Sequence, residues 1–311
     1  MLRALLITSA LTLACVFAAC PDGKRDRNGE LRSVDLGGGQ AVQVPKYATR
    51  IVPGNAAVLD FCAALIGPER FAALPKACLR YSNIPADAQE PWQALPVMEG
   101  LHLEDLASAK VDLIIAHDWQ EPALGPLLER AGIPVLFLPT VHSEEDIFRS
   151  MKWVSLALGV PDAGQEQIQQ LQERVENLAA AKPKVQELTA MVYSNYGAGG
   201  GTAGSGTSYD LMIRLTGMKN AAAQAGIRGH ADLDLEGLLT IQPDVIILST
   251  GPDGSSSTLA ALRSELESIP LKAVEKDQIA LMKSNELTTT SQFTLNAAEN
   301  LQAQVLEMLA R

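Results

Sequence analysis

The stretch at residues 101–116, LHLEDLASAKVDLIIA, occurs a second time at residues 233–248, as LDLEGLLTIQPDVIIL. The two copies align without gaps over 16 positions and share 7 identical residues at an offset of 132. Each copy has leucines spaced about one helical turn apart, and a four-residue apolar run follows Asp112 or Asp244. This pattern predicts a short helix, a turn and a strand buried on both faces. It indicates two similar α/β lobes, although such a unit also recurs within a single doubly wound sheet.

Length and charge narrow the function further. The 311 residues suffice for two domains that each bury a core. The net charge of −11 gives polyanions no electrostatic reason to bind, so we expect no nucleic-acid partner.

The amino terminus has the pattern of an export signal. An apolar stretch at residues 4–20 follows Arg3, and charged residues begin directly after it. Such a stretch is typical of a secretory signal and not of a membrane-spanning helix. Its end, FAAC at residues 17–20, resembles the lipobox of bacterial lipoproteins, which predicts acylation at Cys20. Plain cleavage near Ala19 is the alternative, and both place the mature chain outside the cytoplasmic membrane.

The remaining pattern divides the chain into segments. Residues 21–32 have no apolar period and are predicted to be a tether, with order beginning near Ser33. Alternating strand and helix signals predict parallel-sheet lobes with helical crossovers. The predicted units are a signal peptide, a tether, an N-terminal lobe, connecting helices and a C-terminal lobe, at residues 1–20, 21–32, 33–142, 143–182 and 183–311. No turn-rich linker separates the halves, so a single long helix is expected to join the lobes and to leave a ligand cleft between them.

Two common cofactor motifs are weak in this chain. Residues 199–204, GGGTAG, fit the dinucleotide pattern G-x-G-x-x-G, but no acidic residue ends a second strand about 20 residues further on. We expect a glycine-rich loop there instead. The 4 histidines, His102, His117, His142 and His230, are too widely spaced to form a local metal site, so no bound metal or resident cofactor is predicted.

Three aromatic residues are candidates for ligand contact. Tyr81, Trp119 and Tyr196 each stand where a strand or an irregular segment is expected to end. Ligands of α/β proteins bind at that edge of the sheet. Core packing is the alternative for each residue alone, whereas the group together predicts an aromatic, weakly charged cleft.

The repeat adds two further candidates. Counting back six residues from Glu104 and Glu236 gives Met98 and His230, which should face each other if the lobes do. Each glutamate lies in the first turn of its helix, where the helix dipole favours negative charge. That preference alone is one explanation for the pair.

The sequence resembles the periplasmic binding proteins that serve ABC importers of haem, ferric siderophores and corrinoids. In the C-terminal lobe the resemblance is carried by residues 203–204, 207–210, 213–217, 220–221, 226–230, 235–236 and 243–246. In the N-terminal lobe it is carried by residues 42–45, 50–52, 81–85, 103–104 and 111–114. The resemblance covers roughly residues 33–311.

The resemblance implies a two-lobed fold that closes only slightly on its ligand. It also implies that Glu104 and Glu236 dock with arginines of an importer permease. The tryptophans that corrinoid binders carry at Met98 and His230 are absent, but Tyr81 matches a tyrosine of those proteins. The match at Tyr81 slightly favours a corrinoid as ligand, closely followed by a neutral iron chelate or by haem held by His230.

The expected function is that of a lipid-anchored, non-enzymatic binding protein which delivers a metal chelate to an ABC importer and its ATPase. The alternative is an enzyme with a nucleotide or metal cofactor between the lobes. The sequence lacks a convergent acid/base set, which favours the binding protein. The pairing of Cys62 with Cys78 is left open, since an oxidising compartment permits a disulfide and two buried thiols are equally compatible.

Overall fold

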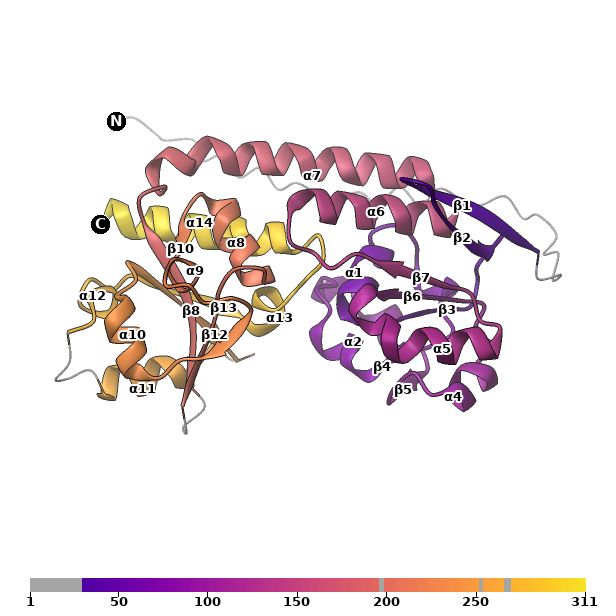
Figure 1. The fold of residues 1–311 in the computed structure, drawn as a ribbon, viewed down its shortest axis with the longest axis horizontal. Coiled ribbons are helices and arrows are strands. Elements are labelled where there is room, and N and C mark those ends of the chain that lie inside the picture. Colours follow the sequence, from indigo (N-terminus) through magenta and orange to yellow (C-terminus); the bar gives the residue numbers. More distant parts are fainter. Residues whose placement is uncertain (1–29, 196–198, 252–253, 266–269) are drawn as a thin grey trace, which may run out of the picture.

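The computed structural model describes residues 30–195, 199–251, 254–265 and 270–311. It consists of two α/β lobes that lie side by side, with a long helix running along one side of both (Figure 1). This confirms the predicted fold class. The signal peptide and Cys20 lie outside the described residues.

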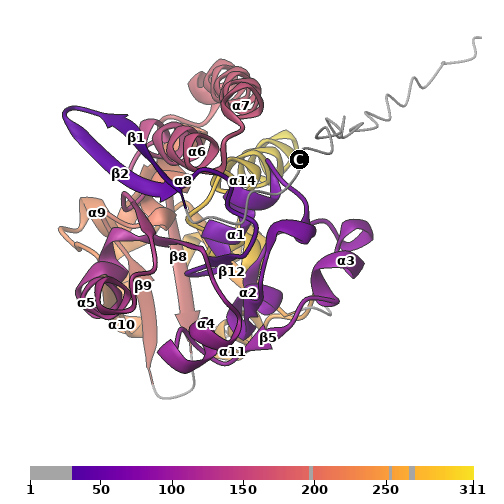
Figure 2. The same ribbon diagram turned by 90° about the vertical axis from the view of Figure 1, so that its right-hand side faces the viewer.

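The N-terminal lobe begins with a hairpin that packs on a connecting helix (Figure 2). Its strands, β1 (Leu31–Gly37) and β2 (Gln40–Pro45), pair antiparallel around a glycine turn. Strand β1 begins two residues before the predicted Ser33, because Arg32 pairs with Val44 and donates to the carbonyls of Leu156 and Ala157. Trp153 anchors the hairpin through a hydrogen bond from Nε1 to Leu36 O.

The sheet of this lobe is parallel. Its strands are β3 (Ile51–Pro53), β6 (Leu113–His117) and β7 (Val135–Leu138) in the order β3-β6-β7, with a separate parallel pair of β4 (Leu74–Pro75) and β5 (Val97–Met98). The helices are α1 (Ala56–Ala63), α2 (Lys76–Tyr81), α3 (Glu90–Gln93), α4 (Leu103–Ser108) and α5 (Glu121–Ala131). Three short 3-10 helices are η1 (Pro68–Arg70), η2 (Ala86–Ala88) and η3 (Asp118–Gln120).

Two helices form the connection. Helix α6 (Glu144–Leu158) starts at a capping box formed by Ser143 and Asp146, and it is capped at its end by Gly159, whose φ of 74° is left-handed. Helix α7 (Pro161–Ala181) then runs along both lobes (Figure 1). Its Arg174 forms an ion pair of 2.7 Å with Glu299 of the last helix. No helix among the described residues has the length and apolar character needed to cross a membrane.

The C-terminal lobe has a mixed sheet in the order β11-β9-β8-β12-β13, and β10 also pairs with β8. The strands are β8 (Thr189–Asn195), β9 (Gly200–Ala203), β10 (Lys219–Asn220), β11 (His230–Asp232), β12 (Val245–Thr250) and β13 (Ile279–Lys283). The helices are η4 (Lys182–Lys184), α8 (Ser208–Thr216), α9 (Ala221–Gln224), α10 (Leu235–Ile241), α11 (Ser257–Glu265), α12 (Lys272–Glu275), α13 (Ser284–Leu287) and α14 (Thr294–Ala310).

The glycine-rich stretch is a strand and not the predicted loop. β9 pairs antiparallel with β8 and with β11, so this sheet is not wholly parallel. A Cβ atom on Gly200 would lie 2.2 Å from Leu233 O, and one on Gly204 would lie 2.0 Å from Ile227 O. These glycines therefore permit close backbone packing, and the dinucleotide interpretation has no support here.

The repeat corresponds to equivalent structure in both lobes. Asp112 accepts hydrogen bonds from the backbone N–H groups of Thr49 and Arg50, just before β3, and Asp244 accepts the same kind of bond from Thr189 at the start of β8. The aspartate shared by the two copies of the repeat thus fixes the start of the neighbouring strand in each lobe.

One apolar cluster extends through both lobes and the connection. It includes Val58 of the N-terminal lobe, Leu171 of α7, Leu301 of α14 and Val245 of the C-terminal lobe. Because interiors are close-packed, a shared core restricts movement of one lobe against the other. The two lobes are therefore joined stiffly.

Candidate functional site

Trp119 projects from the edge of the N-terminal sheet. It lies in η3, directly after β6, and its side chain is 62% exposed. The indole stacks on the imidazole of His117, with ring centroids 6.3 Å apart and an angle of 13° between the planes. A large aromatic surface is therefore held outward on a fixed support.

His117 is fixed by a polar network under that indole. Its Nδ1 lies 2.9 Å from Asn55 Nδ2, which also donates to Gln120 Oε1 at 2.7 Å. Gln120 in turn donates to Gly54 O and accepts from His117 N. Since an amide nitrogen only donates, His117 Nδ1 is the acceptor and the ring proton is on Nε2.

The electrostatics agree with a neutral ring. Burial lowers the pKa of His117 to about 4, although the nearby Asp118 carboxylate opposes the shift. Nε2 is buried without a hydrogen-bond partner among the described residues. In the sequence, His117 stands out only as one of four widely spaced histidines, and the signal for its supporting role is its place between a buried strand and Trp119.

Tyr81 is the last residue of α2 and is 41% exposed. The guanidinium carbon of Arg80 lies 5.1 Å from its ring centroid. The next residue, Ser82, accepts a hydrogen bond through its carbonyl from Asn285 of the C-terminal lobe at 3.4 Å. Tyr81 thus stands beside a contact between the lobes.

His230 is exposed at the first position of β11. Its ring packs edge-on against Tyr209 of α8, with centroids 5.6 Å apart. Helix α8 also carries Arg214, which forms an ion pair with Asp210 at 3.0 Å and donates to His142 O of the other half at 2.8 Å. His230 therefore packs against α8, the helix whose Arg214 contacts the N-terminal half.

A chain of contacts connects this region to Trp119. Asp118, the neighbour of Trp119, accepts a hydrogen bond from Thr140 N at 3.0 Å. Two residues further on, His142 O receives the bond from Arg214. The segment that follows β7 thus contacts both the neighbour of Trp119 and helix α8, on which His230 packs through Tyr209, and Tyr81 stands beside the separate contact made by Asn285.

Of the two remaining candidates for ligand contact, one is buried and the other is not described. Met98 is 7% exposed and packs in the core with Val52, Leu106 and Ile114, so its side chain is not on the surface, while the adjacent Val97 is exposed. Strand alternation explains this exchange. Tyr196 lies outside the described residues.

Glu104 and Glu236 occupy matching positions on the same side of the molecule. Each is the second residue of its helix, α4 or α10, and each is exposed. Both helices lie on the side of the lobes away from α7 (Figure 1). The pair therefore spans the two lobes.

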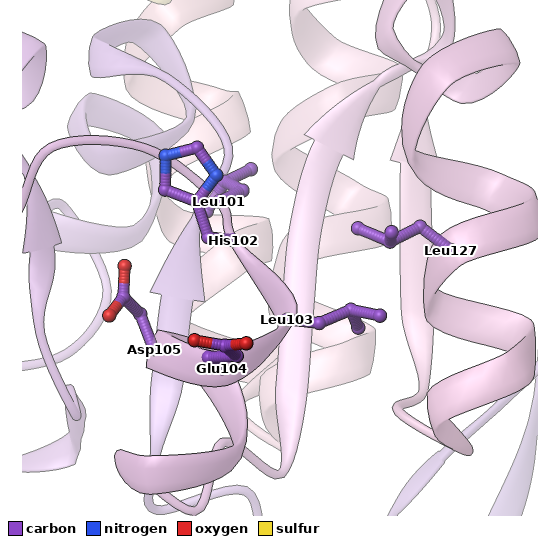
Figure 3. Close-up of a pocket in the computed structure, with 6 residues that line it drawn as sticks. All are labelled: Leu101, His102, Leu103, Glu104, Asp105 and Leu127. Atoms are coloured by element: carbon purple, nitrogen blue, oxygen red, sulfur yellow. The ribbon is translucent and has the colours of Figure 1, made fainter.

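An open hollow surrounds the first glutamate. It has a volume of about 550 Å³ and is lined by Leu101, His102, Leu103, Glu104, Asp105 and Leu127. Figure 3 shows Leu103 and Leu127 pointing toward each other between α4 and α5, with both carboxylates at the rim. An apolar floor with acidic edges suits a cationic side chain with an apolar stem.

Within the described ranges, no group of three or more His, Cys, Asp or Glu residues is placed to hold a metal ion. Cys62 and Cys78 are free and buried, and burial raises the pKa of both thiols, that of Cys78 to about 12. Neither thiol is poised for reaction.

Comparison with known proteins gives one family. The family model described as periplasmic binding protein matches residues 63–286. No curated protein matches the chain.

Solved structures are similar over nearly their whole length. The apo form of the periplasmic heme-binding protein RhuT from Roseiflexus sp. RS-1 is 21% identical, covering 84% of this chain and 99% of that one with a TM-score of 0.70. The periplasmic vitamin B12 binding protein BtuF of Vibrio cholerae is 20% identical, covering 85% and 99% with a TM-score of 0.67. An ABC-type Fe3+-hydroxamate transport protein from Saccharomonospora viridis DSM 43017 is 20% identical, covering 88% and 98% with a TM-score of 0.67. The likeness shows a shared fold.

Proposed function

This chain belongs to the periplasmic binding protein family, and from that premise we propose that it captures a metal chelate between its lobes and delivers it to an ABC importer. The exposed indole of Trp119 on its buried imidazole support is the observation that carries the proposal. Exposing so large an apolar ring costs free energy unless a ligand covers it. A chelate with a flat or apolar face suits such a surface.

The other candidate residues support the same ligand class. Tyr81 offers a second aromatic face, and His230 offers an imidazole to an open metal position. Similar folds in the heme-binding and vitamin B12 binding proteins support a chelate of that size. The described residues contain no convergent acid/base set of the kind that would support the enzymatic alternative.

A ligand panel tests the proposal. Thermal unfolding is measured with cyanocobalamin, haemin and ferrichrome, and with NAD and ATP as ligands of the enzymatic alternative. A chelate at 100 times its Kd should stabilise the folded chain by about 2.7 kcal/mol. A shift with NAD or ATP and with none of the chelates would replace the proposal by the enzymatic alternative.

We further propose that Cys20 is acylated and holds the chain at the outer face of the membrane. The lipobox-like FAAC at residues 17–20 supports this. Metabolic labelling with a palmitate analogue should mark the wild type and not Cys20→Ser. Label that persists in Cys20→Ser, or its absence from the wild type, would leave only secretion of the cleaved chain.

A further inference from the structure

A buried carboxylate lies at the joint between the lobes. Asp60 of α1 is 1% exposed. Its Oδ1 accepts the backbone N–H of Asn83 at 2.7 Å, and its Oδ2 accepts Asn83 Nδ2 and Ser291 Oγ, both at 3.0 Å. Asp60 O also accepts from Gln292 Nε2 at 2.7 Å. One residue therefore binds a turn of its own lobe and the segment that leads into α14.

A second contact holds the same turn from the other side. Asn285 of α13 donates Nδ2 to Asn83 Oδ1 at 3.2 Å and to Ser82 O at 3.4 Å. Ser291, the partner of Asp60, also lies 2.8 Å from Thr289 through their hydroxyl oxygens. Helices α1, α2 and α13 lie where the lobes meet in Figure 1. The 82–83 turn is thus clamped between Asp60 and the C-terminal lobe.

Burying the Asp60 carboxylate at the joint costs free energy, so a gain in stability alone does not explain this residue. A buried carboxylate loses its hydration, and well-packed apolar residues often serve equally well at such places. The carboxylate instead fixes the relative orientation of the two segments, because it accepts hydrogen bonds from three donor groups in one geometry. The residue immediately before the clamped turn is Tyr81, whose ring is part of the proposed ligand site.

We propose that Asp60 is a positioning residue, which fixes the 82–83 turn to the C-terminal lobe and thereby sets where Tyr81 meets the ligand. The clamp is inferred from the hydrogen bonds alone. Its effect on ligand binding rests on the proposed function.

Hydrogen exchange tests the clamp without any ligand. The full chain is compared as wild type, Asp60→Asn and the double variant Asp60→Asn/Asn83→Asp. In the single variant two amide groups face each other as donors, whereas the double variant restores a donor and an acceptor with their places exchanged. Leu128→Ala, which removes a buried side chain of α5, controls for general loss of stability.

We expect exchange in Asp60→Asn to rise at least tenfold at residues 82–84 and 285–293 and to return toward wild type in the double variant. The Leu128→Ala variant should leave those segments at wild-type protection. Unchanged exchange in Asp60→Asn, a rise spread evenly over the chain, or no recovery in the double variant would each overturn the clamp.

The ligand arm uses cyanocobalamin, haemin and ferrichrome as probes. For whichever probe binds the wild type, Tyr81→Ala should weaken binding at least tenfold, and it should cost less than threefold in the Asp60→Asn background, because the ring is already misplaced. Full additivity of the two changes would overturn the positioning role. If none of the three probes binds, the proposed function fails, while the exchange experiment still decides the clamp.

Discussion

Trp119 is held in its outward position by neighbouring side chains that the sequence alone does not identify as a support. The signal that pointed to it was its place after a buried strand, and that prediction agrees with an exposed ring in η3. The support requires Asn55, Gln120 and a buried neutral His117, which are brought together only by the pairing of β3 with β6. Contacts between residues that are distant in the sequence depend on tertiary structure, which is hard to predict from a single sequence.

Removing the indole should weaken chelate binding while leaving the fold intact. We expect Trp119→Ala to lower the affinity about tenfold or more, which corresponds to about 1.4 kcal/mol, because the ligand loses an aromatic surface. Tyr47→Ala is the matched control, since Tyr47 is 74% exposed but lies between β2 and the amino end of β3. Isothermal titration with the best chelate checks both, and a loss within twofold for Trp119→Ala would remove Trp119 from the site.

Asp60 predicts how stability depends on pH. Desolvation by burial raises its pKa to about 6, although hydrogen bonds from Asn83 and Ser291 oppose the shift. The unfolded chain has the ordinary value of 3.8, so the folded chain binds the proton more tightly, and the contribution to stability is lost as pH rises through about 6. Between pH 4 and 7.5 this amounts to roughly 2–3 kcal/mol.

Urea unfolding at both pH values measures the effect. The free energy of unfolding of the wild type, minus that of Asp60→Asn, should be larger at pH 4 than at pH 7.5. Asp87→Asn removes an exposed carboxylate of the same lobe and serves as control. A difference that does not change with pH would contradict the raised pKa.

At the scale of elements, the packing of α6 on α7 depends on one small residue. A Cβ atom on Gly164 would lie 2.1 Å from Ser155 Oγ and 2.2 Å from Ser155 Cβ. Gly164→Ala should therefore push the two helices apart and destabilise the fold by about 1–3 kcal/mol. The double variant Gly164→Ala/Ser155→Gly removes the overlap and should recover most of the loss, apart from about 1 kcal/mol for a glycine inside α6.

Chemical unfolding of the three proteins is the measurement. If Gly164→Ala is as stable as the wild type, the helices are not held by this contact. If the double variant is no more stable than the single one, the loss has another cause.

The repeat was the most informative part of the sequence for the elements. It predicted β6 and β12, which the structure gives as Leu113–His117 and Val245–Thr250, because strands covered on both faces leave an unbroken apolar run. It could not predict β9, whose glycine-rich sequence has no apolar alternation, or β11, whose 3 residues are too few to show one. The burial of Met98 was missed for a related reason, because β5 is too short to show which residue faces inward.

At the scale of the molecule, α7 and the shared core hold the two lobes at a set separation. Glu104 and Glu236 are thereby carried as two exposed carboxylates on one side of a stiff body. Paired arginines on a membrane partner could bind both at once and in one orientation only. Exposed charges of this kind affect association far more than stability.

Chelate-dependent ATP hydrolysis by the cognate importer in proteoliposomes tests delivery and docking together. It compares the wild type with Glu104→Arg/Glu236→Arg, and chelate binding and thermal stability of both proteins are measured in parallel. We predict that the double variant folds and binds its chelate as the wild type does but no longer stimulates hydrolysis, and that each single variant retains part of the stimulation. A double variant that binds its chelate and stimulates the importer as strongly as the wild type would contradict docking through these carboxylates, and a wild type that stimulates no hydrolysis with any bound chelate would contradict delivery itself.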